Sequence, residues 1–252
     1  AGRRKEENTR ITDQFNLNLK GQLNDDWSID SFVTHGQTTL KQKNFNNLIR
    51  QNWAQSIDAI NLNGQIVCRD AAARAAGCVP TSVFGNGAVS TAAANWFNTT
   101  AFSESKIKQR VAGTSFANSN LYDLPAGGIG FAGGVEYREE SSVTIEDPFA
   151  KTGATFFNAL GETDGEYDVS EAFFELSVPL LADKFLIDTL VLDAAARYAD
   201  YSTIGNATSW KLGLDWTINP ELRARFTVSE AIRAPNIDEL FSGQSQSFAN
   251  VD

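Results

Sequence analysis

The sequence predicts an all-β fold: part of an antiparallel transmembrane β-barrel with a lipid-facing surface and a wet interior. Three observations point to it. Apolar and polar residues alternate with a period of two, the alternating segments are about as long as membrane-crossing strands, and short and long connections between them take turns. With 42% hydrophobic and 11% aromatic residues, the 252-residue chain can build a folded core.

Alternation is clearest in 207–218. There an apolar residue occupies every second position from Trp210 to Ile218, and Lys211 and Asp215 lie on the opposite, polar face. The same pattern occurs in 11–20, 172–178 and 222–229. Less regular candidates are 27–35, 107–118, 127–139 and 188–200. The sequence thus predicts about eight strands, each near the roughly 9–11 residues that cross a bilayer at a tilt.

Connection lengths favour a membrane barrel over a soluble sheet with one solvated face. Short turns are expected at 21–26, 119–126, 179–187 and 219–221. Between them lie a very long loop at about 36–106, a long one at 140–166 and a modest one at 201–206. Membrane barrels have minimal turns at one end and long loops at the other, so we expect 36–106 to be external.

The charged residues of the strands indicate which face is wet. Arg223 and Arg225 fall on the polar side of 222–229, and on a lipid face near the midplane each would cost about 2–4 kcal/mol. We therefore expect them to face the lumen. The other residues expected to line it are Glu136, Arg138, Glu175, Lys211 and Asp215. Aromatic residues near strand ends, such as Tyr137, Tyr198 and Trp27, are typical of headgroup level.

Composition excludes several other classes of protein. A net charge of −10 and a pI near 4.7 argue against a nucleic-acid partner, which would need clustered cations. No run of about 18 apolar residues is present, so no membrane-spanning helix is expected. The chain has no Met and no signal segment, so we interpret it as an internal piece of a longer precursor.

The only two cysteines, Cys68 and Cys78, lie in the longest loop. An even pair that closes a small ring favours a disulfide in an oxidising compartment, and two free thiols in a reducing cytosol are the alternative. The spacing does not suit a metal site, and His35 lies outside the loop. Between the cysteines, 71–76 predicts a short helix with Asp70 as N-cap and Gly77 at its end.

No motif supports an enzyme. "GGIGFAGG" at 127–134 is followed by a strand-like segment and not by the helix that a phosphate-binding loop requires, so its glycines are interpreted as clearance for something packed inside the barrel. The acidic residues form no pair with apolar neighbours, and one histidine is too few for a triad or a zinc site. We expect no catalytic residues, no cofactor and no metal.

Three motifs resemble TonB-dependent outer-membrane receptors. "NPELRARFTVSEAIRAPNIDELF" at 219–241 resembles their barrel signature, "GCVPTSVFG" at 77–85 a disulfide-bearing external loop, and "GGVEYREES" at 133–141 another barrel strand. The residues that match the signature are Arg233, Ala234, Pro235, Asn236, Leu240 and Phe241.

The resemblance implies a function as well as a fold. Residues 1–252 would be a partial barrel domain, about a third of a 22-stranded wall, without the N-terminal plug, the TonB-contacting box or the closing strand. The complete protein would sit in the outer membrane of a Gram-negative bacterium, contact lipid and its own plug, and import an iron-siderophore, cobalamin or an oligosaccharide with energy from the TonB complex. The charged wall would hold the plug through breakable salt bridges.

Ligand contacts in such a receptor would come from external loops. The aromatic residues that are candidates for stacking on a small ligand, with loop packing as the alternative, are Trp53, Trp96, Phe97, Phe102 and Phe156. Two other functions compete with the receptor. A soluble, secreted or periplasmic β-sandwich that binds glycans would pack its apolar faces against a second sheet, and a carbohydrate-active enzyme would need a carboxylate pair in a cleft.

Overall fold

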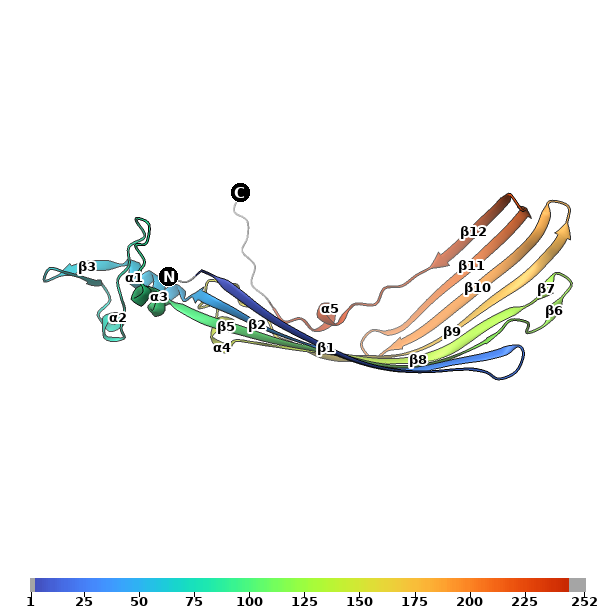
Figure 1. The fold of residues 1–252 in the computed structure, drawn as a ribbon, viewed down its shortest axis with the longest axis horizontal. Helices are drawn as coiled ribbons and strands as arrows, with labels where there is room; N and C mark the ends of the chain where they lie inside the picture. The colour runs from blue at the N-terminus through green and yellow to red at the C-terminus, as the bar shows by residue number, and fades with distance from the viewer. Residues whose placement is uncertain (1–2, 245–252) are drawn as a thin grey trace.

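A single open antiparallel sheet dominates the computed structural model, which describes residues 3–244 (Figure 1). Its strands, in both chain order and sheet order, are β1 (Lys5–Gln22), β2 (Trp27–Leu48), β5 (Asn98–Asn118), β8 (Gly130–Glu146), β9 (Thr163–Lys184), β10 (Ile187–Tyr201), β11 (Gly205–Asn219) and β12 (Leu222–Glu230). Because each strand pairs with the next, the sheet is a meander whose edges are β1 and β12. This confirms the all-β prediction and gives a section of barrel wall that does not close on itself.

The remaining elements are short and lie in the connections. The hairpins are β3 (Ala59–Leu62) with β4 (Gln65–Cys68), and β6 (Asp123–Leu124) with β7 (Gly127–Gly128). The helices are α1 (Arg50–Ile57), α2 (Ala71–Ala75), α3 (Thr91–Phe97), α4 (Pro148–Lys151) and α5 (Ile237–Phe241). Within residues 3–244, none of these helices has the length and apolar character needed to cross a membrane.

Strand register assigns every side chain of the sheet to one of two faces. Figure 1 shows α5 on the concave side of the sheet, and Asp238 of α5 lines a pocket with Arg10, Ser105 and Thr144. Those three residues belong to one row of paired positions, so the positions in register with them face the concave side. We call this the inner face, and the opposite, convex side the outer face.

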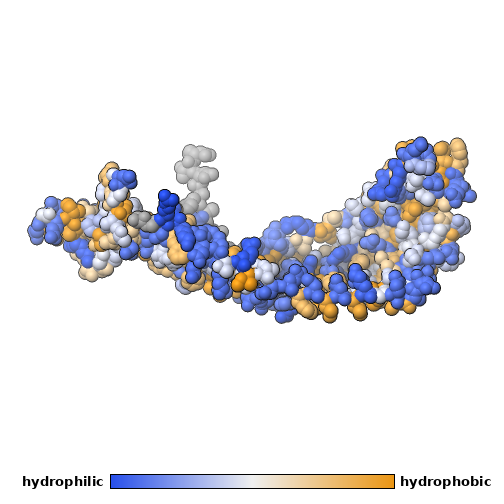
Figure 2. Space-filling view, viewed as in Figure 1, coloured by the Kyte–Doolittle hydropathy of each residue, from blue (hydrophilic) through white to orange (hydrophobic). Residues whose placement is uncertain are grey.

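The outer face is apolar over the middle of the sheet. Its β11 residues Trp210, Leu212, Leu214 and Trp216 pair with Ala196, Ala194, Leu192 and Leu190 of β10. On the other side, Leu212 and Leu214 pair with Val228 and Phe226 of β12, and Phe226 is 60% exposed. Figure 2 shows apolar side chains along the convex side. An apolar sheet face that no other part of the described chain covers is the surface expected of a strand wall in lipid.

The longest connection is shorter than the sequence indicated. We expected it at about 36–106, but β2 continues to Leu48 and β5 starts at Asn98, so only 49–97 lies outside the sheet. The stretches 36–48 and 98–106 are polar on both faces apart from a few residues. A strand that extends beyond the apolar zone has no alternation by which the sequence could reveal it.

The 49–97 insertion has its own small core. Phe97 is 4% exposed and packs with Ala93, Ala94 and Trp53, and the rings of Trp53 and Phe97 meet edge to face at 5.0 Å between centroids. Cys68 and Cys78 form a disulfide. The insertion is therefore a folded unit at one end of the sheet, at the far left in Figure 1.

The helix predicted between the two cysteines is confirmed as α2. The Asp70 side chain accepts hydrogen bonds from the backbone N–H groups of Ala72 and Ala73, and Gly77 follows with a φ of +100°. These two backbone donors, Ala73 first, hold the pKa of Asp70 below its ordinary value.

Two of the glycines in 127–134, Gly128 and Gly134, have a different role from the one predicted. We expected them to leave clearance for a body inside the barrel, but the space above Gly134 holds the ring of Phe173 from the paired position on β9, and Gly128 lies against Asn120. A Cβ atom at position 134 would lie 2.9 Å from Phe173 Cζ and 2.4 Å from the carbonyl oxygen of Thr114. The glycine is needed because a ring of the neighbouring strand covers the backbone.

We expect Gly134→Ala to destabilise the sheet by about 1–3 kcal/mol, because the added methyl group meets backbone that cannot move away. The measurement is the urea unfolding midpoint of the protein in detergent. Gly130→Ala is the matched control on the same strand, since its Cβ would find its nearest neighbour at 3.6 Å. Equal midpoints for the two variants would contradict the packing argument.

Replacing both cysteines, Cys68→Ser with Cys78→Ser, should loosen the 49–97 insertion while leaving the sheet intact. The chain-entropy model assigns about 3 kcal/mol to a ring of this size. Limited proteolysis at Arg69 and Arg74 should become faster in the double variant, and reduction of the wild-type protein should reproduce the change. A cleavage rate identical to that of the oxidised wild type would show that the insertion does not depend on the bond.

Candidate functional site

The inner face has the charged side chains that could contact another domain or a ligand. All seven residues expected to line a lumen fall on it by register: Glu136, Arg138, Glu175, Lys211, Asp215, Arg223 and Arg225. One row of paired positions, for example, runs from Glu175 through Ala195 and Lys211 to Ser229. The structure therefore brings them to one surface, and a role in contacting a plug stays a prediction.

Asp215 is the centre of a three-residue cluster at the β11–β12 end. Its carboxylate accepts hydrogen bonds from the guanidinium groups of both Arg223 and Arg225, with Arg225 Nη2 3.1 Å from Oδ2. The Asp215 side chain is only 12% exposed, whereas the two arginines are 57% and 63% exposed. Because one carboxylate serves two cations, the cluster offers a net positive charge and free N–H donors to whatever lies inside the wall.

A second ion pair joins β9 and β10 on the same face. Arg197 donates to the carboxylate of Glu171, whose side chain is 4% exposed. Nearby, Arg138 Nε lies 3.4 Å from Oε1 of Glu140. We did not predict Glu171 or Arg197. Alternation could have placed both residues in part. Arg197 lies an even number of residues from Asp193, and Glu171 an even number from Glu175, so each shares a strand face with an acidic residue. Alanines on both faces of these strands obscure the alternation.

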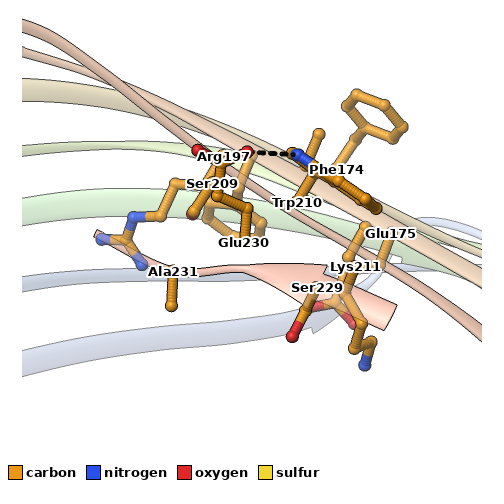
Figure 3. A pocket seen from close by; sticks show the side chains of 12 residues that line it. Phe174, Glu175, Arg197, Ser209, Trp210, Lys211, Ser229, Glu230 and Ala231 are labelled. Atoms are coloured by element: carbon orange, nitrogen blue, oxygen red, sulfur yellow. Dashed lines mark hydrogen bonds between the residues drawn. The ribbon is translucent and has the colours of Figure 1, made fainter. Parts of the chain in front are cut away.

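A pocket of about 370 Å3 opens between these charges and the end of β12. Figure 3 shows Arg197 and Lys211 on one side of the strands and the ring of Phe174 on the other. Trp210 Nε1 donates to Glu230 at 3.1 Å, which ties the end of β12 to β11. Arg197, Lys211 and Glu175 border the pocket together with alanines and aromatic rings, so it offers both charged and apolar contacts.

The segment after β12 crosses the inner face. Ile232 and Ala234 line a pocket of about 310 Å3 together with Arg138, Glu171 and Arg197. Figure 1 shows this segment leaving β12 and passing over the concave side to α5. The sequence signature is thus a stretch that leaves the wall and covers part of its inner surface.

The signature residues explain how this segment is held. Asn236 caps α5 by accepting from the backbone N–H of Glu239, and the Glu239 carboxylate accepts from the backbone N–H of Asn236. Arg233 donates two hydrogen bonds to the same carboxylate, at 2.9 and 3.0 Å. The Arg233 guanidinium, and then the Asn236 N–H, hold the pKa of Glu239 below its ordinary value.

The end of α5 is anchored to β9. The Phe241 ring lies on Gly165, where a Cβ atom would come within 2.1 Å of Phe241 Cγ, and Ser242 forms a β-bridge with Thr163. The neighbouring Gly243 N–H donates to the Glu162 carbonyl oxygen at 3.2 Å. Ala234, Pro235 and Leu240 are half-buried. Arg233 therefore holds the segment to α5 through Glu239, Asn236 caps α5, and Phe241 anchors its end to β9.

The five aromatic ligand candidates separate into two groups. Trp53, Trp96 and Phe97 form the core of the 49–97 insertion. Phe102, which was expected in an external loop, lies on β5, whereas Phe156 lies in the connection between β8 and β9. Both are nearly half exposed, and the Arg4 guanidinium lies 4.2 Å from the centroid of the Phe156 ring. The first three stabilise the insertion, so a ligand role stays a prediction mainly for Phe102 and Phe156. Across residues 3–244 no group of three or more metal-ligating side chains occurs.

Comparison with known protein families shows which family this chain belongs to. The family model described as "TonB dependent receptor-like, beta-barrel" matches residues 1–252. The chain belongs to this family. No curated protein matches it. The match covers the whole sequence. Together with the single open sheet, it argues against the alternative interpretation of the chain as a soluble glycan-binding sandwich of two sheets.

Membership sets the general role of the inner face. TonB-dependent receptors are outer-membrane receptors and transporters rather than enzymes, and their barrels hold a plug domain and act with TonB. In this chain the inner face has the charges of the Asp215 cluster, and the outer face is apolar over the middle of the sheet.

The Arg233 and Glu239 ion pair predicts a pH dependence for the segment that crosses the inner face. A folded pKa below the ordinary value of 4.5 means that the pair stabilises the docked segment above pH 4.5 and that this contribution is lost as the pH falls through the lowered value. Amide hydrogen exchange in 237–241, corrected for intrinsic rates, should therefore rise on acidification.

Glu239→Gln should show fast exchange at every pH. Asp238→Asn is the control, because Asp238 makes no ion pair within the described part of the chain and its removal should leave the pH profile unchanged. A wild-type profile that is flat between pH 6 and about 3 would contradict a role for the ion pair.

Proposed function

We propose that this chain forms part of the wall of an outer-membrane receptor that imports a scarce small nutrient, such as an iron-siderophore, cobalamin or an oligosaccharide, with energy delivered through TonB. The observation that carries the proposal is the division of one meander into a charged inner face and an apolar outer face. A wall of this kind keeps a polar path across the lipid.

The inner-face charges support a reversible contact with a plug. Arg223 and Arg225 share the single carboxylate of Asp215, so both retain donors for acceptors on another domain. Solvated ion pairs are worth about 0–1 kcal/mol each, so such contacts can break and re-form during transport. A buried apolar interface of the same area would resist that movement.

The connections support the direction of uptake. The insertion 49–97, the connection 147–162 and the segment after β12 all lie at the same end of the strands, whereas the opposite end has tight turns such as Phe185 and Leu186. The end with the folded insertion is the one suited to capture a ligand, and Phe102 and Phe156 lie in that region with half-exposed rings.

The experiment is uptake by cells that carry or lack the complete gene. Labelled iron chelates, cobalamin and oligosaccharides are supplied in turn. We expect the deletion strain to lose uptake of one class, and a protonophore to abolish uptake but not surface binding in the complemented strain. Unchanged uptake of every class, or uptake that survives the protonophore, would contradict the proposal.

Charge reversal tests the wall itself. Arg223→Glu with Arg225→Glu should reduce uptake by about tenfold, because two charge-assisted contacts to the plug are replaced by repulsion around Asp215. Arg223→Lys with Arg225→Lys is the matched control, which keeps the charge and should retain most activity. Equal uptake in both variants, at equal amounts of protein in the membrane, would exclude these residues from plug contact.

A further inference from the structure

Charged side chains are distributed unequally over the inner face of the sheet. On β8 to β12 they include Arg138, Glu171 and the Asp215 cluster. On β1, β2 and β5, by contrast, the four consecutive inner-face rows between Arg10 and Lys20 contain no charged residue. We call the inner-face positions of these four rows on β1, β2 and β5 the neutral sector. On β1 and β2 its hydrogen-bonding side chains are Thr12, Gln14, Asn16, Asn18, Thr34 and Thr38.

The border between the neutral and the charged wall lies between β5 and β8. The same four rows continue across this border, and on β8 they contain Glu136, Arg138 and Glu140. One row goes on from Glu136 to Glu171 of β9, and the Gln109 side chain of β5 donates to Glu140 at 3.0 Å. Because both parts are compared at the same height along the strands, membrane depth does not explain the difference. In the described sheet, the charges at this height are confined to one side of the wall.

The neutral sector offers both donors and acceptors of hydrogen bonds. The Thr12 and Thr38 hydroxyl oxygens lie 3.0 Å apart, and the Thr34 hydroxyl donates to Asn16 Oδ1 at 2.8 Å. Within residues 3–244 the exposed Asn18 side chain and the NH2 group of Asn16 form no hydrogen bond. Hydroxyl and amide side chains both donate and accept, whereas Lys and Arg only donate and ionised carboxylates only accept. The sector is therefore complementary to a solute rich in hydroxyl groups, each of which also donates and accepts.

A pocket of about 340 Å3 adjoins the neutral sector on the side of α5. Its charged groups are Arg10 and Asp238, which are of opposite sign and balance each other. Its other lining residues are hydroxyl-bearing or apolar: Thr38, Leu40, Ser105, Ile107, Ser142 and Thr144. Thr38 and Ile107 belong to the first row of the neutral sector, which makes the pocket and the sector continuous. A concave site with hydroxyl groups and apolar side chains suits a sugar ring, whose edge is polar and whose faces carry C–H groups.

The two parts of the inner face suit different kinds of contact. Hydrogen bonds between neutral groups are about half as strong as those that involve an ion, so a solute bound by Thr and Asn side chains leaves each contact easily. Charged groups such as the Asp215 cluster are suited to the stronger contacts that would hold a plug between transport events. They also hold hydration water tightly, which a neutral solute would have to displace. A neutral wall is therefore the better path for a neutral solute.

We propose that a neutral, hydroxyl-rich solute passes through the barrel along the neutral sector and the adjoining pocket, and that the plug rests against the charged strands β8 to β12. The inference rests on the proposed uptake function and narrows its ligand to an oligosaccharide. From Thr12 to Asn18 the path covers six residue steps, or about 20 Å at about 3.3 Å per residue. A ligand with a net charge would instead gain most from matching charges on β8 to β12.

The first test measures uptake of a labelled maltodextrin and a labelled chitin oligosaccharide by cells that produce the complete receptor. Asn16→Asp with Asn18→Asp adds two negative charges to the neutral sector at nearly constant shape. Uptake should fall by about tenfold or more, because an ionised carboxylate no longer donates and retains its own hydration water. Asn16→Ser with Asn18→Ser is the matched control, which stays neutral and should remain within about twofold of wild type at equal amounts of protein.

The pocket has its own test, which measures binding at the cell surface in the presence of a protonophore. Thr38→Val with Thr144→Val removes two hydroxyl groups at nearly constant shape and should weaken binding of the transported oligosaccharide by about fivefold or more. Thr217→Val with Thr227→Val is the control, because it makes the same change on the inner face of β11 and β12 and should leave binding unchanged. Equal binding by the wild type and both variants would exclude the pocket from the ligand site.

A thiol reagent tests where the plug lies. Asn16→Cys and Ser229→Cys place a thiol on the inner face of β1 and of β12, and the native Cys68 and Cys78 are joined in a disulfide. In outer membranes that contain the complete receptor, a small neutral maleimide should label Asn16→Cys faster than Ser229→Cys, because the plug covers the charged strands. Rates are divided by those of the urea-unfolded variants, which removes differences in intrinsic thiol reactivity. Equal rates, or faster labelling of Ser229→Cys, would contradict this placement of the plug.

Uptake by the wild type separates this inference from the proposed function. Import of an iron chelate or cobalamin, but of neither oligosaccharide, would overturn the inference and leave the proposed function intact. Equal oligosaccharide uptake by the wild type and by Asn16→Asp with Asn18→Asp would also overturn it. Normal uptake of every class by the deletion strain would contradict the proposed function and this inference together.

Discussion

The whole structure depends on the phase of side-chain alternation in a hydrogen-bonded sheet. Within lipid every backbone N–H and C=O must be paired, so neighbouring strands have to run side by side without gaps. Pairing fixes register, and register fixes which side chains share a face, because a shift of one residue would exchange the two faces completely. The inner-face row from Glu175 to Ser229 and the neighbouring outer-face row at Trp210 both depend on this one strand register.

Alternation also explains which parts of the fold and site were predictable. Where one face is lipid and the other water, as in β11 and β12, the sequence shows period two and the prediction of Lys211, Asp215, Arg223 and Arg225 on one face was correct. Beyond the lipid, both faces are wet and the two-residue alternation disappears, so the parts of β2 and β5 next to the 49–97 insertion were mistaken for loop. The limit is physical, because alternation appears only where the two faces of a strand border different media, and a strand with water on both faces shows none.

Contacts between distant parts of the chain were beyond the sequence for another reason. Gly134 was interpreted as clearance for something packed inside the barrel, whereas Phe173 fills the space, and no local sequence pattern connects Gly134 with Phe173. The anchoring of Phe241 on Gly165 is of the same kind. The signature at 233–241 could be recognised as a string of residues, but its role in crossing the inner face follows only from the strands it lies upon.

The two faces of this wall solve opposite electrostatic problems. On the inner face Asp215 and Glu171 are nearly buried and each is bound by arginine, which fixes the arginines in place while their outer donors stay solvated. On the outer face the paired positions around Leu212, Val228 and Phe226 are apolar and exposed, which suits contact with lipid. Preorganised hydrogen-bond donors on the inner face and an apolar band on the outer face therefore both follow from one sheet that borders two different media.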